Sequence, residues 1–80
     1  MLEKLQTQKK IVGIKQSTKA LNQDKVETLF VAEDADGHLI QSMRQLAAVK
    51  NVKVVDVDSM RELGKACGID VGAAVAAVLK

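Results

Sequence analysis

Short apolar segments alternate with longer amphipathic ones along the chain, and this alternation limits the folds that are open to it. Segments rich in β-branched residues predict strands, and apolar residues spaced three and four apart predict helices. On this basis we predict strands over residues 11–14, 26–32 and 52–57. We predict helices over residues 2–8, 15–23, 38–50 and 60–67. Strands that alternate with helices favour an α/β layer fold, with helices on both faces of a small sheet.

The last apolar segment, residues 69–79, fits two structures. Alanine is the best helix former, so propensity favours a helix from Ala73 onward. Gly72 interrupts the segment, however, and a strand buried on both faces has an equally continuous apolar pattern. These rules leave both structures open.

Polar residues at the segment boundaries predict how the helices begin and end. Ser59 and Glu62 form a capping box, in which each side chain accepts a hydrogen bond from an otherwise unpaired backbone N–H group. Gly68 is expected to adopt the left-handed conformation that ends a helix, and Asn51 is a suitable C-terminal cap. The carboxylates of residues 33–37 are expected to cap the helix that follows them.

Few residues in the chain could support catalysis or bind a metal. Cys67 is the only cysteine, so no disulfide or cysteine-based zinc site can form within the chain, and we expect a small buried side chain there. His38 is the only histidine and is expected to be an exposed first-turn residue. The chain has no phosphate-loop motif, so we expect no catalytic residue, no metal and no cofactor. No apolar segment is long enough to cross a membrane, and no secretory signal opens the chain, so we expect a cytoplasmic protein.

Charge is distributed unevenly along the chain, although the net charge is only +2. Residues 1–25 hold six lysines and two acidic residues, whereas residues 26–43 hold four acidic residues and no lysine or arginine. Such asymmetry can orient a polyanion on one face of a protein. Phe30 is the only aromatic residue, which argues against RNA-binding modules that stack bases on surface rings. Any nucleic acid must therefore be recognised by its backbone, its shape or its base edges.

Residues 13–19 combine features that suit such recognition. Gly13 lies between a predicted strand and a predicted helix, where glycine permits a sharp turn and a close approach to a ligand. The N–H groups at a helix start favour an anion. Lys15 and Lys19 are four residues apart and share one helical face, and Gln16 can both donate to and accept from a base edge. From these residues alone, a solvated lysine face on an amphipathic helix is the favoured interpretation.

Three blocks in the same order resemble the L7Ae and L30e ribosomal proteins, a family that binds kink-turn RNA. Residues 13–19 are similar to the family's G-x-N/K-E/Q-x-x-K signature at the start of its second helix. Residues 29–36 resemble its central strand and acidic loop, and residues 58–70 resemble its S-x-x-x-L-G-x-A-x-G block. The resemblance covers nearly all of residues 10–79 and is to the short, bacterial-type members.

The resemblance implies a three-layer α/β/α sandwich around a small four-stranded mixed sheet, formed by residues 1–80 as a single RNA-binding domain. It also implies that the final apolar segment is a strand. In the family, the second-helix signature enters the RNA groove at tandem sheared G·A pairs, where the duplex bends sharply. Lys15 and Gln16 would then meet guanine edges, Lys19 would hold a base or a phosphate, and Gly13 would allow the close approach.

Other site residues are implied by the same resemblance. The loop before the last strand packs against a flipped-out nucleotide in the family, which here corresponds to Ile69, Asp70, Val71 and Gly72. Asp36, with Ile40 behind it, would line the pocket of the same nucleotide, and Met60 falls near a phosphate-contacting position. The commonest signature has asparagine and glutamate at the positions of Lys15 and Gln16, whereas the L30e branch has Lys-Gln.

We therefore expect a monomeric, non-catalytic protein whose partner is a structured RNA with a kink-turn, such as ribosomal RNA or a riboswitch-like RNA, and no membrane. The alternative is a protein-interaction adaptor on the same fold, because fold does not fix function. An exposed apolar patch would indicate an adaptor, and a basic rim would indicate an RNA-binding protein.

Overall fold

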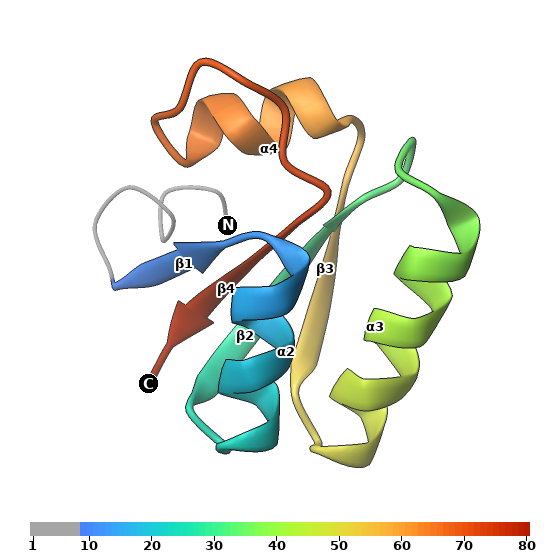
Figure 1. The fold of residues 1–80 in the computed structure, drawn as a ribbon, viewed down its shortest axis with the longest axis vertical. Coiled ribbons are helices and arrows are strands. Elements are labelled where there is room, and N and C mark those ends of the chain that lie inside the picture. Colours follow the sequence, from blue (N-terminus) through green and yellow to red (C-terminus); the bar gives the residue numbers. More distant parts are fainter. Residues whose placement is uncertain (1–8) are drawn as a thin grey trace.

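The computed structural model describes residues 9–80, so the helix expected over residues 2–8 lies outside the described residues. Four strands and three helices alternate within this range (Figure 1). They are β1 (Lys10–Val12), α2 (Ile14–Asn22), β2 (Val26–Ala32), α3 (Gly37–Val49), β3 (Lys53–Val57), α4 (Met60–Ala66) and β4 (Val75–Leu79). The final segment is thus a strand, and the helix that alanine propensity favoured there is wrong. The first strand is also shorter than predicted, because Ile14 already belongs to α2.

The sheet is mixed and has the strand order β1-β4-β2-β3. The strands β2 and β3 are parallel and are connected through α3, whereas β4 pairs antiparallel with both β1 and β2. Phe30 lies at the centre, opposite Ala76 on one side and Val55 on the other. The last strand of the sequence is therefore inserted into the middle of the sheet.

Side chains of the two central strands alternate between two apolar cores. Leu29 and Val31 of β2 pack with buried residues of α2 and α3, including Leu21 and Met43. The opposite face is covered by α4, whose buried residues pack against Phe30, Ala32, Ala76 and Val78. Fully burying a side chain as large as phenylalanine stabilises a fold by about 1.5–3 kcal/mol. The α/β/α sandwich is confirmed, with α2 and α3 side by side on one face in Figure 1 and α4 on the other.

Two of the helices begin with the side-chain caps that the sequence predicts. The Asp36 carboxylate accepts hydrogen bonds from the backbone N–H groups of His38 (2.9 Å) and Leu39 (3.3 Å) at the start of α3. The Ser59 hydroxyl accepts from the backbone N–H of Glu62 at 3.1 Å, so the serine half of the capping box is confirmed. These caps satisfy donors that a helix start leaves unpaired.

Left-handed residues end the helices. Gly68 follows α4 with φ 80°, as predicted. The C-cap of α3 is Lys50 rather than Asn51, and Asn51 lies one residue beyond it with φ 59°. Asparagine tolerates this conformation better than most residues, which explains its place there. Within residues 9–80, no helix is both long and apolar enough to cross a membrane.

Candidate nucleic-acid interface

The topology brings most of the predicted site residues to one end of the sheet. β1, β2 and β3 all run in the same direction, and β4 runs in the opposite direction. The ends of the first three strands, the starts of the helices that follow them, and the segment before β4 therefore lie together, toward the top of Figure 1. We call this end, formed by residues 13–16, 33–37, 58–61 and 69–74, the loop end.

Backbone hydrogen bonds hold the start of α2 and the end of β2 against the beginning of β4. The Gly13 N–H donates to the Val75 carbonyl at 3.1 Å, and the Ala32 N–H donates to the Ala74 carbonyl at 2.9 Å. Gly13 has φ 110°, in a region that side chains with a Cβ rarely adopt. Apart from its chain neighbours, no heavy atom of residues 9–80 lies within 4 Å of the place where its Cβ would stand, so these residues leave that side of the backbone open to a ligand.

Of the three helices that the structure describes, α2 is the one that begins without a side-chain cap. Its first turn also contains no acidic residue. The N–H groups at the positive end of this helix dipole therefore receive no side-chain cap from residues 9–80. Lys15 and Gln16 are exposed in the same turn, and Lys19 is exposed about one turn farther along. Neither lysine forms an ion pair with any residue in the range 9–80.

The inner face of α2 explains why these side chains point outward. Ser17, Ala20 and Leu21 are buried against the sheet. The Ser17 side chain is fully buried, and its hydroxyl oxygen has no hydrogen-bond partner within the described part of the chain. Its small size lets α2 lie close to β4. The residues of the 13–19 segment are thus divided between a packed inner face and a cationic, amide-bearing outer face.

The segment before β4 is held tightly against α4 by two glycines. A Cβ added at Gly64 would lie 2.0 Å from the Val71 carbonyl oxygen, and one added at Gly72 would lie 3.1 Å from the Met60 Cβ. The Ile69 N–H donates to the Gly64 carbonyl at 3.1 Å, and the Ala73 N–H donates to the Met60 carbonyl at 3.0 Å. The loop of residues 69–72 is therefore a fixed feature of the loop end.

This fixed loop presents different side chains to the core and to solvent. Ile69 is half-buried and packs against the core under α4. Val71 is 71% exposed, which is unusual for a large apolar side chain in a segment held this firmly, and Asp70 is exposed beside it. An exposed apolar side chain on a rigid loop is suited to packing against a flat apolar surface such as a base.

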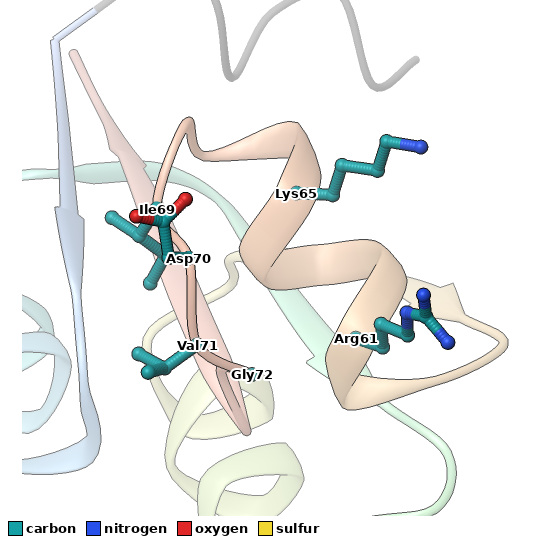
Figure 2. Close-up of a pocket in the computed structure, with 6 residues that line it drawn as sticks. All are labelled: Arg61, Lys65, Ile69, Asp70, Val71 and Gly72. Atoms are coloured by element: carbon teal, nitrogen blue, oxygen red, sulfur yellow. The ribbon is translucent and has the colours of Figure 1, made fainter.

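A groove of about 240 Å³ lies between this loop and α4. Figure 2 shows Arg61 and Lys65 extending from one side of α4, while the side chains of Ile69 and Val71 lie on the other side, beyond the loop. Sequence reasoning did not assign a role to these two cations. The available signal was their four-residue spacing on a helix that follows a capping box.

The remaining predicted site residues lie near the loop end, but each of them already contacts another part of the protein through a hydrogen bond or through packing. The Asp36 carboxylate is used to cap α3, and Ile40 is half-buried against the core under α2 and α3. The Met60 N–H donates to the Asp34 carboxylate at 2.7 Å, which links the segment after β2 to the start of α4. The structure thus brings Gly13, Lys15, Gln16, Asp36, Met60 and residues 69–72 together, with Lys19 and Ile40 about one turn farther away.

Cys67 lies outside the loop end and is buried beneath α4. Burial raises the pKa of its thiol, and the positive charge of Lys10 partly opposes this effect. The thiol therefore stays protonated near neutral pH, and it packs as a small apolar side chain. No group of three or more histidine, cysteine, aspartate or glutamate residues within residues 9–80 is placed to hold a metal ion.

Comparison with known proteins identifies relatives along the chain. The sequence model of the ribosomal protein L7Ae/L30e/S12e/Gadd45 family matches residues 1–80. An RNA-binding protein of Bacillus pumilus is 51% identical over 74 residues, which are 92% of this chain and 90% of that protein. The large ribosomal subunit protein eL8 of Halobacterium salinarum is 40% identical over 68 residues, 84% of this chain and 57% of that protein. The solved structure of the Giardia lamblia 15.5kD RNA binding protein is similar with a TM-score of 0.87 and 29% identity, over 99% of this chain and 68% of that one.

Proposed function

This chain belongs to the ribosomal protein L7Ae/L30e/S12e/Gadd45 family, and from that premise we propose that it is a non-catalytic protein that recognises kink-turns in structured RNA. RNA binding itself agrees with the names of its relatives, which include RNA-binding proteins and a ribosomal protein. Recognition of the kink-turn is the finer part of the proposal, and it rests on the geometry of the loop end.

The observation that carries the proposal is the uncapped start of α2 beside an exposed apolar loop. Phosphate oxygens can accept from the first N–H groups of α2, where the helix dipole adds to the attraction. Lys15 and Lys19 supply positive charge on the same helix that no acidic residue among residues 9–80 neutralises in an ion pair. Val71 stands at the same end of the sheet. A straight duplex has no unstacked base to offer to Val71, whereas a kinked RNA with a flipped-out nucleotide does.

Each proposed contact has a chemical role. Lys15 can only donate, so it suits the O6 and N7 acceptors of guanine. Gln16 can donate and accept, and it can therefore meet both an acceptor and an amino group on neighbouring bases. Lys19 would neutralise a phosphate, and Val71 with Ile69 would pack on the flipped-out base. Affinity would come largely from the phosphate contacts, and selectivity from shape with a few base edges.

The proposal extends to the context in which the protein works. We propose that residues 1–80 act as one RNA-binding domain, as a monomer, in the cytoplasm. The natural target would be ribosomal RNA or a riboswitch-like RNA that contains a kink-turn. No catalytic step is assigned to the protein.

The distribution of exposed apolar side chains favours RNA over a protein-interaction adaptor. The large exposed apolar residues among those described are Leu39, Val49 and Val71. Leu39 and Val49 lie near opposite ends of α3, about 15 Å apart along the helix at 1.5 Å per residue. Leu39 and Val49 therefore do not belong to one contiguous apolar patch of the kind that marks a protein partner's binding surface.

A paired titration tests the proposal. A short labelled RNA with a kink-turn would be titrated beside the same RNA whose tandem G·A pairs are changed to Watson–Crick pairs. We expect sub-micromolar binding to the first and much weaker binding to the second. Lys19→Ala should weaken binding to the kink-turn and lower the slope of log K against log salt by about one. Equal, weak binding to both RNAs would refute recognition of the kink-turn, and an unchanged salt slope would refute the phosphate contact of Lys19.

A further inference from the structure

A second groove, of about 190 Å³, lies beside α2 where the helix meets β1 and β4, and it shares no lining residue with the groove beside α4. Its rim is polar, and its floor is apolar. The rim consists of Gln16, Lys19, Gln23 and Lys25, and the floor includes Ile11 and Leu79. We call this feature the α2 groove.

The α2 groove is lined by residues from Gln16, which belongs to the proposed RNA site, to Lys25, which lies beyond the end of α2. Gln16, Lys19 and Gln23 are spaced by three and four residues, so they share one face of α2. Seven residues separate Gln16 from Gln23, which is about 10 Å along the helix. Lys25 follows directly beyond the helix end. The groove therefore connects the loop end with the opposite end of α2.

The position of Lys25 is fixed by its backbone. Its N–H donates to the Ala20 carbonyl at 3.0 Å, and its carbonyl accepts from the Lys80 N–H at 2.9 Å. The exposed side chain is thus presented from a rigid turn between α2 and β2. A cation on a rigid turn pays less ordering entropy on binding than one on a mobile segment.

Charge in the α2 groove is of one sign. Among residues 9–80, its lining contains two lysines and no acidic residue. Asp24, the acidic neighbour of Lys25, lies in a left-handed turn with φ 57°, and its carboxylate is 3.5 Å from the Lys50 ammonium of α3. Lys19 and Lys25 have no ion pair with another residue in the range 9–80. A polyanion would meet no opposing acid among the described residues that line this groove.

We propose that the α2 groove holds the phosphate backbone of one RNA stem that continues from the bend. This inference rests on the proposed function, because Gln16 and Lys19 belong both to the signature that would read the bend and to the rim of the groove. Lys19 and Lys25 contact two phosphates of the stem, and Gln23 donates to phosphate or 2′-hydroxyl oxygens between them. The apolar floor contacts the ribose.

The contribution of Lys25 to RNA affinity should depend on the length of the stem. An RNA whose stem ends close to the bend cannot reach Lys25, whereas an RNA with a full stem can. The substitution Lys25→Gln should therefore weaken binding only when the stem is long enough. A general loss of positive charge would instead weaken binding to every RNA alike.

The experiment combines protein variants with RNAs of different stem length. The wild type and Lys25→Gln would each be titrated with a kink-turn RNA carrying two full stems, and with two derivatives in which one stem or the other is cut back toward the bend. Lys25→Arg keeps the charge. Lys53→Gln is the matched control, because Lys53 is an exposed lysine on β3 at the far edge of the sheet.

We expect Lys25→Gln to bind the full RNA about threefold to tenfold more weakly, with a salt slope lower by about one. It should match the wild type on one of the two shortened RNAs, and Lys25→Arg should restore binding to the full RNA. Equal losses on all three RNAs, or the same loss with Lys53→Gln, would overturn the inference, as would no loss at all. The wild type on the Watson–Crick control RNA reports separately on the proposed function. If the wild type binds the control RNA as tightly as the kink-turn RNA, the proposed function is wrong, and the assignment of the stem to the α2 groove is wrong with it.

Discussion

The contact between Gly64 and the backbone of the 69–72 loop is the most demanding packing feature of the loop end, and Gly64→Ala tests it. The added Cβ would lie 2.0 Å from the Val71 carbonyl oxygen, 3.0 Å from the Val71 carbonyl carbon and 3.1 Å from the Gly72 Cα. All three atoms belong to the backbone, so no side chain can rotate to make room. The loop must move by more than about 1 Å to restore an ordinary contact distance.

Overpacking of this kind lowers the free energy of unfolding by about 1–3 kcal/mol, and we expect a value near ~3 kcal/mol because the clash is with backbone atoms. Alanine regains about 1 kcal/mol over glycine inside a helix. We therefore expect Gly64→Ala to lower the free energy of unfolding by about 2 kcal/mol. For a domain of this size, that loss corresponds to a decrease in Tm of about 8–16 °C.

Urea denaturation and thermal melting would measure the loss, with Gly37→Ala as the matched control. Gly37 is also helical, but a Cβ added there meets no heavy atom of the described residues within 4 Å beyond its own helix turn and chain neighbours, so this variant should be as stable as the wild type or slightly more stable. Gly64→Ala should also weaken binding to kink-turn RNA, because the displaced loop carries Val71. Equal stability of the two variants, with unchanged amide chemical shifts for residues 69–72, would refute the packing argument.

Two further substitutions separate binding from stability at the loop end. Val71→Asp should weaken binding to kink-turn RNA at least about tenfold, because it places an acid against the flipped-out nucleotide and its phosphate. Its melting temperature should stay close to that of the wild type, since Val71 is 71% exposed, and a large fall in Tm would show that Val71 belongs to the core. Asp34→Ala removes the acceptor of the Met60 N–H and should cost about 0.5–2 kcal/mol in urea denaturation. An unchanged denaturation midpoint would show that Ser59 alone is a sufficient cap for α4.

The parts of the fold that sequence could predict are those in which local pattern and tertiary environment agree. The segment at β2 is β-branched and bounded by polar residues, and it forms the expected strand over Val26–Ala32. The segment at β4 could not be assigned in this way, because it lies between β1 and β2 and is covered on both faces. Burial on both faces removes the alternation of apolar and polar residues that identifies a strand. Only the family resemblance indicated a strand there.

The candidate site, too, could be predicted from the sequence only where local pattern determines the structure. The outward face of α2 follows from the spacing of Lys15 and Lys19, and the cap at Asp36 follows from its place before a helix. The hydrogen bond from Met60 to Asp34 spans 26 residues, and the close approach of Val71 to Gly64 depends on how the chain returns across α4. Such contacts depend on the complete topology. For the same reason, the groove that joins Arg61 and Lys65 to the 69–72 loop could not be inferred from the helix alone.

Amide chemical-shift mapping with a kink-turn RNA would show whether the RNA binds at the loop end. The labelled protein would be titrated with the RNA, and shift changes would be followed for every residue that can be assigned. The account predicts the largest changes at residues 13–16, at Asp36 and at residues 69–72, with little change at Lys53 on β3. Changes spread evenly over all exposed lysines, or centred on the far end of α3 near Val49, would contradict a binding site at the loop end.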